Sequence, residues 1–457
     1  MNPSQAKRQP PVPQTAIWWL HPFWIVAVPL LVISFVAYLV PESDYRENWR
    51  TPKAFNAAAF GLCIAVATAF SAGCLLASWI DAGFSLGHRI APGARDVRVG
   101  QRGLRILFAV AFVATIAGYT IWFGSILRVG GTGMLTNMLT GGYGASDEVK
   151  TIVTESTILG VTKFAQLGMG TALLGTYLGF AQGWHKVRAR LALLLSVTVL
   201  RAFFLSERLA LLEVVLPSVI LMIRLVGFGR PGSALRRFLI VAPVVGIVGL
   251  YGLFTFTEYF RSWSSPFAHR RTELLSFSLL RLLGYYVTAL NNGAIEWQAL
   301  GALHFPYSTM SGLWKFPVVG GPLQRALGGT NPPSGEVRLA LNTAEGNPEL
   351  NSPSGIFVVF TDFGVTGALL YFAMLGCGAA LLYGSYRRGS AAGIFLYSFL
   401  FVGLTEQLRN IYISEDRALP TWPLLLCVVF ISRSHLRRAT NSGKPAARAD
   451  PTSTAAG

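Results

Sequence analysis

The sequence predicts an all-α polytopic membrane protein with about ten transmembrane helices and one large outer loop. Of its 457 residues, 52% are hydrophobic and only 13% are charged, and its mean hydropathy is +0.49. The apolar residues fall into many separate runs, most of them long enough to cross a hydrocarbon core about 30 Å thick. Together these observations indicate a helical protein that crosses the membrane repeatedly.

The apolar runs are interpreted as spans in chain order. The first is too long for a cleavable signal and lacks a small-residue cleavage site, so we expect it to remain as an anchor. The ninth and tenth are short. The expected spans are 17–40, 54–80, 104–124, 157–181, 189–205, 209–228, 238–257, 354–382, 391–404 and 417–432.

Basic residues concentrate in alternate connections, which predicts the orientation of the chain. Loops rich in Lys and Arg stay on the cytoplasmic side. Such residues follow spans two, four, six and eight, and they also occur at both termini. We therefore expect a multi-pass protein with both termini in the cytoplasm. The connections expected outside are 41–53, 125–156, 206–208, 258–353 and 405–416.

The segment 258–353 is the only long hydrophilic stretch and is expected to form a large extracytoplasmic loop. No other polar stretch reaches the roughly 50 residues of a small domain, so residues 1–457 form a single transmembrane domain. Residues 433–457 are expected to form a basic, disordered cytoplasmic tail that touches anionic lipid. The loop favours an enzyme over a transporter, because an enzyme acting on a lipid-linked substrate builds its site at one membrane face.

Several function classes lack their characteristic signals. The net charge of +17 lies mainly in short connections explained by topology, and no binding motif accompanies it, so no nucleic-acid partner is expected. The chain contains no Walker-type glycine loop, HExxH or paired CxxC. We expect no cofactor and no metal, since no cluster of metal-ligand residues is evident. All four cysteines fall within expected spans: Cys63, Cys74, Cys377 and Cys427. Because the motifs for nucleotide hydrolysis and zinc proteolysis are missing, we expect the reaction to use a pre-activated substrate.

Among the ionisable residues within or beside the expected spans, four call for an explanation. Arg201 and Arg208 flank a short outer turn, where they either anchor a hairpin at the headgroups or bind phosphate oxygens through their planar guanidinium groups. Lys163 and Glu213 lie deeper. We expect them to form one buried ion pair, since burying either charge alone costs several kcal/mol. A proton path or a substrate contact is the alternative.

The long loop begins at Glu258 and continues into an apolar-periodic stretch at 274–290, which predicts a helix lying at the interface. Arg281, Tyr285 and Asn291 combine charged, aromatic and amide groups. This mixture suits the apolar faces and hydroxyl rims of a sugar. A solvated amphipathic surface is the alternative.

Further candidates follow nearer the end of the chain. Asn342 lies in a segment rich in Pro, Gly and Asn, which is typical of loops. Asp362 lies where the loop re-enters the membrane, and it either caps the following helix or acts as a base. Arg409 stands close to Glu406 and either binds phosphate or forms an ion pair at the rim of the membrane.

These features resemble the bacterial O-antigen polymerases, the Wzy family of oligosaccharide repeat-unit polymerases. The resemblance covers most of the chain as architecture, together with the arginine-led span at Ser206-Glu207-Arg208 and the Asn-rich approach to Asp362-Phe363-Gly364. It implies a membrane glycosyltransferase of the C type in the bacterial inner membrane. Its activity is the transfer of a growing glycan from undecaprenyl pyrophosphate to the next lipid-linked repeat unit, on the outer face and without a nucleotide sugar.

The resemblance also suggests partners and residue roles. The partners are an undecaprenyl-pyrophosphate-linked oligosaccharide, membrane lipid, a chain-length regulator and a flippase. Pyrophosphate needs charge stabilisation and the attacking hydroxyl needs a base. The expected roles are pyrophosphate binding by Arg208, Arg261, Arg281 and Arg409, base catalysis by Asp362 or Glu258, and sugar contact by Tyr285, Asn291 and Asn342.

Two alternatives to a polymerase remain, one a related enzyme and the other a transporter. The related O-antigen ligases share this general architecture and use an outer-loop histidine, for which His269 and His304 are the residues available here. Neither residue matches a ligase motif. A lipid-linked oligosaccharide flippase or exporter is the second alternative, although it needs more basic residues within the spans than Lys163 and Arg201.

Overall fold

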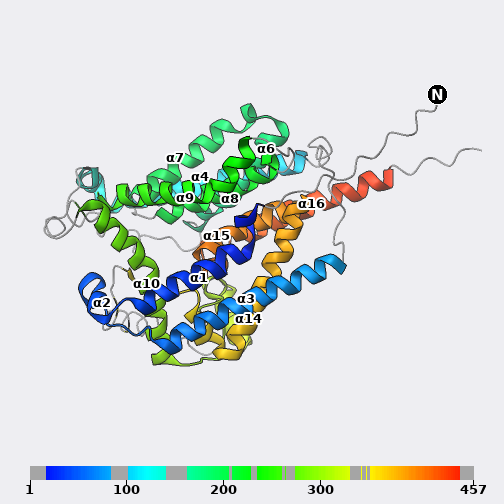
Figure 1. Cartoon of the computed structure of the whole chain (residues 1–457). Helices are drawn as coiled ribbons and strands as arrows, with labels where there is room; N and C mark the ends of the chain where they lie inside the picture. Colours follow the sequence, from blue (N-terminus) through cyan, green and yellow to red (C-terminus); the bar gives the residue numbers. More distant parts are fainter. Residues whose placement is uncertain are drawn as a thin grey trace, which may run out of the picture.

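A computed structural model describes the parts of the chain from which the fold is built. These are residues 17–83, 101–139, 162–204, 208–227, 234–259, 263, 273–316, 318–329, 341, 346 and 350–442. All regular structure within them is helical (Figure 1). The predicted all-helical class is therefore confirmed for the described residues.

Seven helices in the described part of the chain are long and apolar enough to cross a membrane, with α8 extended by the π-helical turn Ile223–Gly227. They are α1 (Pro22–Leu39), α3 (Ala57–Gly83), α4 (Gln101–Leu139), α8 (Arg208–Met222), α9 (Ala234–Glu258), α10 (Leu274–Leu300) and α14 (Phe357–Arg388). Each of the expected spans that begin at 17, 54, 104, 209, 238 and 354 overlaps a different one of these helices.

The remaining expected spans coincide with shorter helices. The apolar part of α16 covers Thr421–Ser432, and a π-helical turn leads into α15 to give an apolar helix over Gly393–Glu406. These elements are α6 (Gly168–Gln182), α7 (Arg188–Phe204), α15 (Ser398–Glu406) and α16 (Thr421–Ser442). Short helices also lie in the connections: α2 (Glu42–Trp49), α11 (Ser311–Trp314) and α12 (Gly320–Ala326).

Helices α3 and α14 form the most extensive helix pair, and glycines let their backbones meet. A Cβ placed on Gly376 would overlap the backbone of Phe70, and one placed on Gly73 would overlap the backbone of Ala373. The Cys74 Sγ also lies 3.4 Å from the Gly376 carbonyl oxygen. Small residues at such crossings let dispersion contacts and polar contacts hold membrane helices together where the hydrophobic effect cannot.

Helix α10 lies across one end of the bundle. It makes polar contacts with three other segments: Tyr251 donates to the Leu275 carbonyl, Trp49 to that of Leu280, and Asn292 to that of Leu350. A helix running alongside α9 would contact α9 along its length. In Figure 1, α10 instead runs steeply to α1 and α3, close to one end of each. We call this end of the bundle the loop end.

The segment 258–353 is thus organised around a long helix and is not hydrophilic throughout. The expected interfacial helix at 274–290 extends to Leu300, where Gly301 ends it with a positive φ of 63°. Residues Val287 and Leu290 are fully buried in the same core as Phe357 of α14. The loop therefore packs into the bundle through α10.

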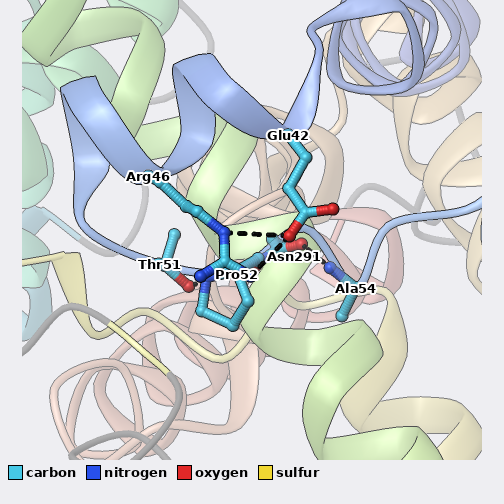
Figure 2. A network of polar contacts seen from close by, with 6 residues as sticks. All are labelled: Glu42, Arg46, Thr51, Pro52, Ala54 and Asn291. Carbon is cyan, nitrogen blue, oxygen red and sulfur yellow. Dashed lines mark hydrogen bonds and ion pairs between the residues drawn. The ribbon is translucent and has the colours of Figure 1, made fainter.

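Asn291 ties α10 to the connection between α2 and α3. Its side-chain oxygen accepts hydrogen bonds from the backbone N–H groups of Ala54 and Phe55, at 2.8 and 3.0 Å. Its amide nitrogen donates to the Pro52 carbonyl at 2.9 Å and to the Thr51 hydroxyl at 3.4 Å. Figure 2 shows Asn291 beside Thr51, Pro52 and Ala54, together with the separate Arg46–Glu42 ion pair of α2. The side chain is fully buried and engaged by protein, so we omit it from the proposed sugar site.

Replacing Asn291 with Leu is expected to lower the thermal stability of the purified protein. The change leaves the N–H groups of Ala54 and Phe55 without the acceptor that binds both. Each buried donor left unsatisfied costs about 1–3 kcal/mol. The measurement is thermal unfolding in detergent. Gln298→Ala is the control, because it removes only an exposed hydrogen bond to the Ala54 carbonyl. An equal midpoint for Asn291→Leu and the wild type would contradict the structural role.

Candidate functional site

Residues 405–420, which run from the last residues of α15 to the start of α16, bring charged side chains to the loop end. We call this segment the charged turn. Within it Arg409 lies 3.2 Å from Glu406, measured from Nη1 to Oε2. Arg417 lies 3.8 Å from Glu213 of α8, and Asp416 lies 3.4 Å from Lys163. The turn is therefore joined by ion pairs to two other parts of the chain.

The ion pairs of Lys163 and Glu213 differ from the one expected. The two residues were expected to pair with each other, but the structure pairs Lys163 with Asp416 and Glu213 with Arg417. Lys163 belongs to the 3₁₀ helix Thr162–Leu167, and its side chain is only partly buried. Lys163 and Glu213 each have an oppositely charged partner, as expected. These partners are two consecutive residues of the charged turn, Asp416 and Arg417.

One face of α10 meets the charged turn. Arg281 and Tyr285 lie four residues apart, so they share this face. The Arg409 guanidinium lies over the Tyr285 ring, 5.2 Å from the ring centroid, and Phe254 of α9 contacts the same ring edge-on at 5.7 Å. A cation over an aromatic face is stabilised by the electrons of the ring. Arg409 thus lies over Tyr285, one helical turn along α10 from Arg281, whose guanidinium lies over the Phe277 ring.

Glu258 forms an ion pair with Arg281. Its Oε2 lies 3.5 Å from the Nε of Arg281, and the glutamate side chain is fully buried. A buried carboxylate needs such a cation, because an isolated charge is costly away from water. Glu258, Arg281, Tyr285 and Arg409 come from three stretches of sequence, and the structure brings all four together.

Asp362 anchors a different segment. Its carboxylate is fully buried and accepts hydrogen bonds from the backbone N–H groups of Ser308 and Thr309 and from the Thr309 hydroxyl, at 2.6–3.2 Å. Two residues later, Gly364 breaks the helical geometry of α14 with a φ of 69°. Asp362 therefore positions the segment that leads into α11.

Two glycines position the charged turn by close backbone contact. A Cβ on Gly312 of α11 would lie 2.8 Å from the carbonyl carbon of Glu415. One on Gly355, just before α14, would lie 2.6 Å from the Asn410 carbonyl oxygen. Gln407 adds a hydrogen bond of 2.7 Å to the Gly355 carbonyl. The Asp362-anchored segment and the start of α14 thus clamp the charged turn.

Glu415 and Tyr412 have perturbed acidities in this turn. Burial raises the pKa of Glu415, the nearby Arg417 opposes that rise, and Glu213 and Glu406 add to it. Burial and the neighbouring Glu213 raise the pKa of Tyr412. Glu415 and Arg417 were not among the residues expected at the site. The available signal was the Glu-Asp-Arg run at 415–417, where the expected outer connection 405–416 meets the expected span 417–432.

The structure does not bring every predicted residue to this cluster. Arg208 begins α8, and its side chain lies outside the described part of the structure, as do Arg261, Asn342 and His269. His304 is exposed and has a positive φ of 54°. In the described ranges, no group of three or more His, Cys, Asp or Glu residues is arranged to hold a metal ion.

Comparison of the chain with protein-family models, with curated proteins and with solved structures finds no match.

Proposed function

We propose that this protein is a membrane glycosyltransferase that polymerises oligosaccharide repeat units carried on undecaprenyl pyrophosphate. In this proposal it works at the outer face of the bacterial inner membrane, with both termini in the cytoplasm, and it builds a surface polysaccharide. The observation that carries the proposal is the position of Arg409 over Tyr285, one helical turn along α10 from the Arg281–Glu258 ion pair.

The two arginines suit the leaving group of this reaction. A pyrophosphate carries several negative charges, and guanidinium groups bind phosphate oxygens through parallel N–H donors. Glu258 orients Arg281, and Glu406 accepts from Nη1 of Arg409. The buried Nε–H of Arg409 has no hydrogen-bond partner among the described residues, so it can donate to a phosphate oxygen. Fixed donors of this kind stabilise the charge that develops as the glycosidic bond to pyrophosphate breaks.

The position of the site suits a substrate that is half lipid and half sugar. Helix α10 lies across the bundle end, where apolar spans give way to connections. An undecaprenyl chain would remain among the spans, while its pyrophosphate and sugars reach this end. Tyr285 offers an aromatic edge to a sugar ring. A flippase is the partner class that would deliver such a lipid, and a chain-length regulator would limit the polymer.

The first test is elongation by the purified protein alone. The detergent-solubilised protein is incubated with native undecaprenyl-pyrophosphate repeat units, whose integrity is checked by mass spectrometry, and the products are separated on a gel. A ladder of increasing length is the expected result. Transfer to a separate acceptor lipid without a ladder would establish a ligase instead. Scrambling of fluorescent lipid-linked sugar in liposomes, without elongation, would identify a flippase.

A further inference from the structure

The acidic residues gathered at the loop end differ in what they bind. Five of them are engaged through their carboxylates. Four form ion pairs, and the fifth, Asp362, accepts three hydrogen bonds at 2.6–2.8 Å and a longer one at 3.2 Å. The paired acids are Glu213 with Arg417, Glu258 with Arg281, Glu406 with Arg409, and Asp416 with Lys163. A carboxylate held in this way is a poor proton acceptor, because the cation or donor stabilises its charged form.

Glu415 is the exception in this cluster. Its carboxylate makes no hydrogen bond or ion pair with any residue that the structure describes, although its side chain is half-buried. Its backbone is nevertheless well held. The N–H of Glu415 donates to Tyr412, and its carbonyl accepts from Ala418 and Leu419 at 3.0 and 3.1 Å. The backbone of α11 packs closely against it at Gly312. The turn thus fixes the residue and leaves its carboxylate available.

The surroundings of Glu415 also favour proton uptake. Burial is the largest effect, and it raises the pKa of the carboxyl group above its ordinary value. Glu213 and Glu406 act in the same direction, whereas Arg417 and Lys315 oppose it, and Tyr412 lies alongside. A catalytic base works best when its pKa approaches the operating pH, so this direction of shift suits the task.

We propose that Glu415 is the general base of the transfer reaction, an inference that rests on the proposed function. Its carboxylate takes the proton of the attacking sugar hydroxyl. As that oxygen forms its bond to the anomeric carbon of the donor, the bond from that carbon to the pyrophosphate oxygen breaks. Undecaprenyl pyrophosphate leaves with the electron pair, opposite the charges of Arg281 and Arg409. Glu258 and Asp362, which the sequence suggested for this role, instead act as positioning residues.

The test compares Glu415→Gln with a matched surface variant. Glu415→Gln keeps the shape of the side chain and removes the base, so the rate of elongation is expected to fall about 10²–10⁴-fold. Binding of the lipid-linked donor is expected to persist. Glu42→Gln is the control, because Glu42 forms an exposed pair with Arg46 at the same end of the bundle. This control is expected to elongate at the wild-type rate.

The pH profile separates a base from a residue that only supports the turn. The wild-type rate is expected to fall as pH drops through the pKa of Glu415, since protonation removes the base. Glu415→Gln should lose this acid limb, and Glu415→Asp should retain a limb at a shifted pH with a reduced rate. If Glu415→Gln does not fold, the Asp variant decides the question by the same measurements.

The outcomes distinguish this inference from the proposed function. A wild-type ladder together with full rate and an unchanged acid limb in Glu415→Gln would overturn the assignment of the base and leave the polymerase proposal intact. The same result in Glu415→Asp would overturn the assignment if only that variant folds. No ladder from the wild type on intact substrate would reject the function and the assignment together.

Discussion

Replacing Arg409 with Ala is expected to lower the rate of glycan elongation by about 10²–10³-fold, the loss typical of removing one donor that stabilises developing charge. Arg409 is the arginine that contacts both Glu406 and the Tyr285 ring, and its Nε–H remains available to a ligand. The Arg409→Lys variant keeps the charge and loses the planar fork, so it should recover only part of the rate. Elongation by purified protein, at several donor concentrations, measures both losses.

Arg46→Ala provides a matched control for this prediction. Arg46 also pairs with a glutamate on its own helix, but the pair is exposed, with 66% of the arginine side chain accessible. Exposed pairs contribute at most about 1 kcal/mol. We expect Arg46→Ala to elongate normally. Normal elongation by Arg409→Ala, with protein amounts matched, would remove Arg409 from the site and weaken the proposed function.

Replacing Gly376 with Leu is expected to prevent recovery of folded protein. At this position α14 meets the backbone of α3 at Phe70, so a larger side chain cannot be accommodated by rotating a flexible neighbour. Overpacking costs about 1–3 kcal/mol even where side chains can move, and here two backbones must separate. Since α3 and α14 belong to the same core as α1 and α10, separating them would disturb the loop end as well. Size-exclusion chromatography and thermal unfolding in detergent would show the loss.

Gly378→Leu is the control for Gly376→Leu. It lies two residues further along α14, and a Cβ placed there has no atom of another residue within 4 Å. The two variants therefore add the same apolar side chain to the same helix, on different faces. Gly378→Leu is expected to give folded protein with a midpoint close to that of the wild type. A normal midpoint for Gly376→Leu would show that the close α3–α14 crossing is not required.

The sequence was sufficient for the class of the protein and for several of its site candidates. Runs of apolar residues longer than a bilayer core can only be accommodated as spans, which is why the class could be predicted without knowing any contact. The residues Glu258, Arg281, Tyr285 and Arg409 stood out for a related reason. Placing a charged group beside a membrane span costs free energy, so such a residue indicates a structural or functional role even before its contacts are known.

Tertiary structure decided which of these groups meet. Sequence showed that Lys163 and Glu213 each need an opposite charge, but only the folded charged turn supplies Asp416 and Arg417 to them. Sequence could not show that Asn291 binds the backbone of residues 51–55. Nor could it show that the Glu415 carboxylate, unlike the paired acids around it, has no partner among the residues that the structure describes. The need for a partner follows from the chemistry of one side chain, whereas the identity of that partner depends on how distant segments pack.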